Sequence, residues 1–336
     1  MMFTFKQQRG FNLVELMIAL VVGLFLVAGA LRIYTQSQTA IQVNESIARI
    51  QETARFAMGI IEKDVRAAEL WGRTNNPLAI NGSGEPAAAD IYGVTSHCEP
   101  NWSVHVARAI EGANNSNPYA GSCIPSTAYQ PGSDVLVVRH ADEVEVATAD
   151  LQPGVIYLRS NSNFGQIFVG TTEPTNVSVD AVNNALVSVA YWISNRSDND
   201  PSVPSLRRSF LGAVGGNPTI INEEVISGVE DMQVQYGIDT TGDNSVNTYV
   251  DFDDVTNTDA IMVARVWIRV RAENAEMGFK DDATFIYADS RFRALDIAGG
   301  ATVDADIEKY RRVLVTKTME LRNRRADRLT VAAAAP

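Results

Sequence analysis

Cysteine and histidine are scarce in this sequence of 336 residues, which contains two cysteines and three histidines. Two cysteines are too few for a zinc site built from thiolates. Cys98 and Cys123 suit a single disulfide that closes a loop in an oxidising compartment, with free thiols as the alternative. His97 lies beside Cys98, so that segment is either a Cys/His metal pair or a loop histidine next to a disulfide.

Positive charge is also in short supply. The chain has 28 lysines and arginines against 40 aspartates and glutamates, for a formal net charge of -12. This acidic balance argues against nucleic acid as a partner. Cations do gather near the C-terminus, within Tyr310–Arg328. There they would either contact DNA or an acidic partner, or protect the edge of a sheet.

Sequence motifs for catalysis are missing. The chain has no GxSxG, HExxH, Walker loop or dinucleotide fingerprint, and no arrangement of residues that assigns a nucleophile and a base. We therefore expect a protein that is not an enzyme.

One loop suggests a ligand. Oxygen-bearing side chains alternate at Asp239, Thr241 and Asp243, which faintly resembles a calcium loop. The glycine of this loop is at the wrong place for such a site, and a polar hairpin turn explains the same residues. We expect no cofactor unless this loop binds calcium.

Charge is nearly absent from the N-terminal region. Residues 11–31 are an apolar run whose only charged side chain is Glu15. A helix of that length spans roughly 30 Å, one bilayer core. The ten preceding residues contain Lys6 and Arg9 and no acid, which predicts a cytoplasmic N-terminus. A lone carboxylate costs about 2.5–3.5 kcal/mol at the centre of a membrane helix, so the presence of Glu15 in this run requires an explanation.

The helical pattern continues beyond the apolar run. No proline interrupts residues 11–76, and an apolar stripe with three- and four-residue spacing runs through the second half of this segment. Trp71-Gly72 and the following Asn-Asn-Pro form a stop signal. We expect one helix with a membrane-spanning or filament-core half, residues 11–33, and an amphipathic half, residues 34–72.

The remainder of the chain alternates short β-type runs with polar loops, as in an antiparallel β-rich head over residues 73–330, followed by a tail, residues 331–336. The runs form two groups, which would be two subsheets on one helix. The first comprises Asp134–His140, Glu143–Thr148, Val155–Arg159 and Gln166–Val169. The second comprises Leu186–Ser194, Val229–Ile238, Ala260–Arg271, Thr284–Ala294 and Tyr310–Leu321.

The N-terminus resembles the type III signal of type IV prepilins. The resemblance rests on Gly10 before a cleavage point, Phe11 after it, and Glu15 as the fifth mature residue ahead of the apolar run. An ordinary secretory signal is instead cut after its apolar region. The resemblance implies that a prepilin peptidase removes residues 1–10 and methylates Phe11, and that Glu15 pairs with the terminal amine of a neighbouring subunit. The alternative is a signal anchor with a stray glutamate near the headgroups.

Two further segments resemble PilW-type minor pilins: RIQETARFAMGIIEKDVRAAELWG at residues 49–72 and YRRVLVTKTMELRNR at residues 310–324. The resemblance implies a pilin-like α+β fold, in which the long N-terminal helix packs on an antiparallel β-rich head. It implies storage in the bacterial inner membrane, with the head in the periplasm, and later transfer to a surface pilus. The implied partners are other minor pilins, the major pilin and a tip adhesin. The rivals are a minor pseudopilin of a type II secretion system, a membrane-anchored periplasmic enzyme and a component of a DNA-uptake pilus.

Overall fold

The computed structural model describes residues 12–86, 88–121, 123–178, 180–297 and 306–323. The chain divides into two units, residues 1–48 and residues 49–336, which are described separately here. The helix α1 (Leu13–Ala67) is continuous over 55 residues, as the absence of proline predicts. Its first 36 residues belong to the first unit and the rest to the second.

The helix ends at Ala67, four residues before the predicted end at Trp71. Glu69 adopts a positive φ of 66°, which a right-handed helix does not accommodate. Its N–H donates to the carbonyl of Arg139, and the carbonyl of Leu70 accepts from the N–H of Ala141. Backbone pairing with a strand therefore replaces the last helical turn.

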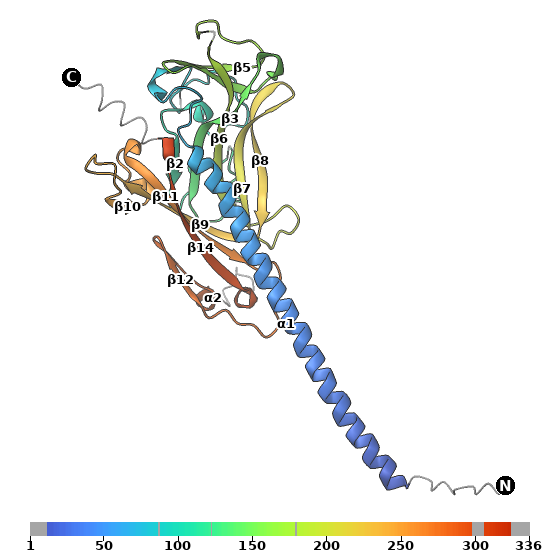
Figure 1. Ribbon diagram of the computed structural model, residues 1–336. Helices are drawn as coiled ribbons and strands as arrows, with labels where there is room; N and C mark the ends of the chain where they lie inside the picture. The colour runs from blue at the N-terminus through green and yellow to red at the C-terminus, as the bar shows by residue number, and fades with distance from the viewer. Residues whose placement is uncertain (1–11, 87, 122, 179, 298–305, 324–336) are drawn as a thin grey trace, which may run out of the picture. The chain divides into compact units, whose positions relative to one another are not determined.

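The larger sheet has eight strands, in the order β1-β5-β4-β6-β3-β2, with β7 beside β6 and β8 beside β7 (Figure 1). All pairings are antiparallel except β1 with β5. The long strand β6 pairs with β4 near its start and with β7 near its end. The strands are β1 (Ile80–Asn81), β2 (Ile110–Ala113), β3 (Val135–Val146), β4 (Ile156–Ser160), β5 (Gly165–Val169), β6 (Val182–Ser194), β7 (Ser205–Val214) and β8 (Asn217–Ser227).

The second sheet has four antiparallel strands in the order β10-β9-β11-β14. The segment between β11 and β14 contains a hairpin, β12–β13, and the short helix α2. These elements are β9 (Val229–Ile238), β10 (Thr248–Val250), β11 (Ile261–Arg271), β12 (Thr284–Tyr287), β13 (Ser290–Arg293), α2 (Ala294–Ile297) and β14 (Arg312–Glu320). Single 3-10 turns lie at Pro77–Ala79, Trp102–Val104, Thr148–Asp150, Phe252–Asp254, Thr258–Ala260 and Ile307–Lys309.

Two subsheets and an α+β fold are confirmed, but the membership of the sheets differs from expectation. The predicted runs on either side of Asp142 are one strand, β3, because an irregularity between Ala141 and Glu145 lets pairing with β6 continue. β6 was grouped with the later strands, yet it is central to the larger sheet. β7 and β8 were not predicted.

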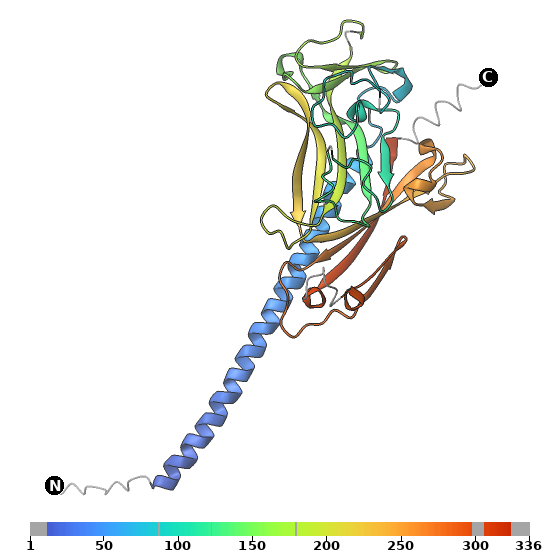
Figure 2. The same cartoon turned by 180° about the vertical axis from the view of Figure 1, so that it is seen from behind.

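The second half of α1 lies in the main core of the second unit. Its buried side chains recur with helical spacing and contact buried residues of both sheets. They are Ile50, Ala54, Ala57, Met58, Ile61 and Val65. The predicted amphipathic stripe is thus confirmed as a core-facing surface from Ile50 onward, whereas Ile41 is exposed. A second core contains Trp71, Trp102 and Trp192 and joins buried residues of the larger sheet to buried residues of the loops on either side of β2. The larger sheet is seen from behind in Figure 2.

Candidate functional site

The N-terminus of α1 is capped by Glu15. Asn12 precedes the first helical residue, and its backbone N–H donates a 3.1 Å hydrogen bond to the Glu15 carboxylate. An acid at the third helical position that bonds back to the cap residue is one half of a capping box, and its charge suits the positive end of the helix dipole. Glu15 therefore has a partner within its own chain. Gly10 and Phe11 lie outside the described residues.

The apolar run that follows Glu15 is not buried. An 18-residue window of α1 has a mean hydropathy of 2.6 and no buried residue, and Phe25 is 76 % exposed. Length and composition fit one membrane span. An apolar surface of this extent marks contact with lipid or with other proteins.

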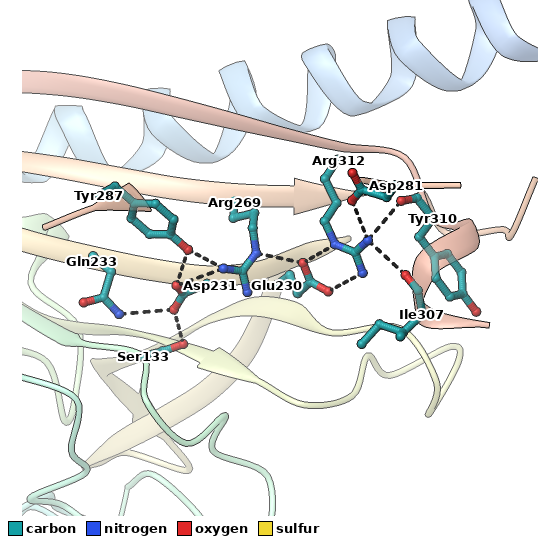
Figure 3. Close-up of polar contacts among 10 residues, drawn as sticks. All are labelled: Ser133, Glu230, Asp231, Gln233, Arg269, Asp281, Tyr287, Ile307, Tyr310 and Arg312. Atoms are coloured by element: carbon teal, nitrogen blue, oxygen red, sulfur yellow. Dashed lines mark hydrogen bonds and ion pairs between the residues drawn. The ribbon is translucent and has the colours of Figure 1, made fainter. Parts of the chain in front are cut away.

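A chain of buried polar contacts covers the face of the second sheet that is turned away from α1 (Figure 3). Glu230 accepts a 2.9 Å hydrogen bond from Nε of Arg269 and two bonds, of 2.8 and 3.0 Å, from Arg312. Arg312 also donates a 2.9 Å bond to Asp281. Nε and Nη2 of Arg312 thus each bond to a different oxygen of the Glu230 carboxylate. Such a bidentate contact is a strong geometry for an ion pair.

A β-bulge brings two consecutive acids to this face. Asp231 pairs in register with Arg269, whereas Val229 pairs with the next residue, Val270, so Glu230 is the extra residue. The result is that Glu230 and Asp231 both contact Arg269, at 2.9 and 3.6 Å. Adjacent residues of a regular strand would point to opposite faces.

The charges of this network are fixed. Burial on its own would raise the pKa of Glu230, but Arg269 and Arg312 outweigh burial and lower the pKa to about 2. Burial also acts to lower the pKa of Arg312, yet Glu230 and Asp281 raise it. Such a network holds segments together.

The network ties the hairpin β12–β13 to the rest of the head. The hydroxyl of Tyr287, on β12, donates a 2.5 Å hydrogen bond to Asp231 and also contacts Arg269. Ser133, from the loop before β3, donates a 2.6 Å bond to the same Asp231. One carboxylate on β9 therefore joins the hairpin to the larger sheet.

Asp134 is a second buried junction. Its carboxylate accepts backbone hydrogen bonds from Asn115, at 2.9 Å, and Val234, at 2.7 Å. Asp289 at the hairpin tip accepts a 2.7 Å bond from the side chain of Asn115. Burial raises the pKa of Asp134 to about 7, although both backbone bonds oppose the rise.

The predicted disulfide between Cys98 and Cys123 is confirmed. The two Cα atoms are 4.7 Å apart, and both side chains are buried in the second core. The bond closes the loop region over the larger sheet.

The predicted ligand loop is the turn of the hairpin β9–β10. The Asp239 carboxylate accepts hydrogen bonds from the backbone N–H groups of Thr241, Gly242 and Asn244. Asp243 accepts one from the N–H of Ser245. In the described part of the chain, no group of three or more His, Cys, Asp or Glu side chains is arranged to hold a metal. Calcium binding by Asp239 and Asp243 stays a prediction.

Among the C-terminal cations, Arg312 and Lys317 lie on the edge strand β14, and Arg311 directly precedes it. Their charges are largely matched: Arg311 binds Glu276 at 2.9 Å, Arg312 binds Glu230, and Lys317 binds Glu62 of α1. Arg324, Arg325 and Arg328 lie outside the described residues.

Two family profiles match the sequence. The profile described as Type IV Pilus-assembly protein W matches residues 190–323, and the profile described as prokaryotic N-terminal methylation motif matches residues 5–31. The first match contains the second sheet and the residues of its polar network apart from Ser133, and the second contains Glu15 and the apolar run. No curated protein and no solved structure matches the chain.

Proposed function

We propose that this chain, which belongs to the PilW family of type IV pilus-assembly proteins and carries the N-terminal methylation motif, is a minor pilin. In this role it joins other minor pilins to prime pilus assembly and supports the pilus tip. The observation that carries the proposal is the exposed apolar helix with an acid near its start, which begins shortly after the predicted cleavage point. A protein processed there keeps its membrane helix, which a secreted enzyme has no reason to do.

The proposed mechanism is assembly. Prepilin peptidase cleaves between Gly10 and Phe11 and methylates Phe11, and the apolar helix then stores the subunit in the inner membrane with its head in the periplasm. On extraction into the pilus, the Glu15 carboxylate gives up its hydrogen bond to the N–H of Asn12 and pairs with the terminal amine of a neighbouring subunit. Because the second half of α1 is part of the core of the head, a force on the helix is transmitted to the head.

The partners proposed on this basis are other minor pilins, the major pilin and an adhesin at the tip. The head would reach the cell surface only as part of the pilus. Its buried ion pairs and its disulfide then serve to keep the head folded outside the cell.

Mass spectrometry of the N-terminal peptide, on protein extracted from membranes, tests the processing step. We expect methylated Phe11 as the first residue, and a product that starts at Met1 or Met2 would contradict the proposal. An antibody against the protein should detect it in pili sheared from the cell. Deletion of its gene should reduce the number of pili. Loss of protein secretion with normal pili would instead identify a pseudopilin.

A further inference from the structure

The strand β14 is the free edge of the second sheet. It pairs with β11 alone, in an antiparallel register that runs without interruption from Arg312 to Glu320. Thr316, Lys317 and Thr318, near its end, are exposed. The strand lies between α1 and the segment with the hairpin β12–β13 (Figure 1).

The direction of its backbone groups follows from the register. The carbonyl of Arg311 accepts from Ala272, and the N–H of Leu321 donates to Met262, so odd-numbered residues of β14 bond to β11. Even-numbered residues therefore point their N–H and C=O groups outward. Within the described residues, the backbone groups of Leu314, Thr316 and Thr318 have no hydrogen-bond partner.

This edge lacks the features that usually block pairing with another chain, which are short length, bulges, proline and unmatched charge. The similarly long edge strand β8 has Pro218, a register shift and adjacent glutamates, and the loop residue Thr95 bonds to it. The other edge of the second sheet, β10, has three residues. The one lysine near the middle of β14, Lys317, is neutralised by Glu62.

The edge is also held rigid from both ends. Arg312 is fixed by Glu230, Asp281 and the carbonyls of Ile307 and Tyr310 (Figure 3). At the other end Met319 is fully buried in the main core. A preordered strand loses little conformational entropy when a second strand binds to it.

We propose that β14 binds an extended strand of another pilin-like subunit by β-strand addition, and this inference rests on the proposed function. Main-chain hydrogen bonds would supply the affinity and the alternate side chains the specificity. The face toward α1 presents Val313 and Val315, and the other face presents Thr316 and Thr318. Since Lys317 is already neutralised, the fitting partner segment is uncharged and rich in Val, Ile and Thr.

Hydrogen exchange at single-residue resolution tests the proposal. The full-length protein in detergent would be compared with the same protein co-purified with the pilin-like proteins of its own pilus system. We expect the amides of Leu314, Thr316 and Thr318 to exchange at least about tenfold more slowly in the complex. The amides of Val313, Val315 and Lys317 bond to β11 in both states and are the internal control.

Two substitutions sharpen the test. Thr316→Pro removes an outward N–H at an edge position that tolerates proline, and we expect at least about tenfold less complex. The control Thr316→Val keeps the N–H and should assemble normally. If Thr316→Pro lowers the melting temperature of the protein, Thr316→Lys serves as the test variant instead. Its added edge charge blocks strand addition and leaves the backbone bonds to β11 intact.

Each outcome is decisive. A complex in which the three outward amides stay unprotected, or in which Thr316→Pro and Thr316→Lys both assemble normally, overturns strand addition and leaves the proposed function standing. If the three outward amides become protected in the isolated protein as its concentration is raised, the edge binds a second copy of the chain. Protection that disappears when the chain is truncated after Asn323 assigns it to its own tail. Either result also overturns the proposal of strand addition. If the protein is absent from all pilin complexes, the proposed function is overturned as well.

Discussion

The hydroxyl of Tyr191, in β6, donates a 2.6 Å hydrogen bond to the carboxylate of Asp64 on α1, 127 residues away in sequence. Burial, and then the charge of Asp64, raise the pKa of Tyr191 well above its usual value of 10, so the hydroxyl keeps its proton. His140 on the neighbouring strand lies 3.6 Å from the same carboxylate. The helix is therefore attached to the larger sheet by polar contacts as well as by its apolar stripe.

Tyr191→Phe should lower the free energy of unfolding by about 1–3 kcal/mol, because the substitution leaves the mostly buried Asp64 without its donor. Chemical denaturation of the full chain in detergent measures the change. Tyr249→Phe is the matched control, since that ring is partly exposed and no hydrogen bond to its hydroxyl is present among the described residues. Equal effects of the two substitutions would show that the contact adds nothing.

Glu230→Gln should be far more damaging. The substitution leaves Arg269 and Arg312 buried without their shared counter-charge, and loss of one partner from a buried ion pair typically costs about 3–5 kcal/mol. Glu223→Gln is the control, because Glu223 pairs with Arg208 at the surface, where such a pair contributes about 1 kcal/mol or less. Thermal unfolding of both variants measures the difference, and similar losses would contradict the importance of the network.

The stability of the head should depend on pH through Asp134. Its pKa is raised by burial to about 7, so the folded protein binds this proton more tightly than the unfolded chain does. The resulting stability is fully present below about pH 4 and is lost as the pH rises to about 7, with a size on the order of 4 kcal/mol. Urea titrations at several pH values should show this decline relative to Asp134→Asn. A constant difference between the two proteins would contradict it.

Removal of the disulfide with Cys98→Ala and Cys123→Ala should lower the free energy of unfolding by about 3 kcal/mol, the value for a closed loop of roughly this length. The two cysteines are separated by 25 residues in sequence. A reductant should destabilise the parent protein and leave the double variant unchanged. Reduction without any change in melting temperature would refute the prediction.

Prediction from sequence succeeded where the signal is local and repeated. The continuous helix follows from the absence of proline and the apolar spacing, and the strand of residues 261–271 follows from strict alternation. β7 and β8 were missed although Gly215-Gly216 between them is a hairpin signal. Their residues alternate poorly because much of this hairpin is only partly buried.

The polar network was not predictable, and the reason is geometric. Arg269 and Arg312 are far apart in sequence and come together through the pairing of β11 with β14, and Asp281 lies in the segment that connects these strands. The bulge at Glu230 reverses the orientation expected from alternation, so periodicity would place that acid in the apolar core. By contrast, Glu15 draws attention because a single charge in an apolar run is visible in sequence alone, and its role in assembly stays a prediction. Its contact with Asn12 was not foreseen.

The capping contact between Asn12 and Glu15 allows the two roles of this acid to be separated. Glutamine also forms the capping bond, so Glu15→Gln keeps the helix N-terminus but loses the charge, whereas Glu15→Leu loses both. If the charge pairs with the terminal amine of a neighbour, both variants should remain in the membrane and be depleted from sheared pili to a similar extent. If the cap alone matters, Glu15→Gln should assemble like the parent protein. Immunoblots of membrane and sheared-pilus fractions measure the ratio, and a normal ratio for Glu15→Gln would remove the charge from the proposed mechanism.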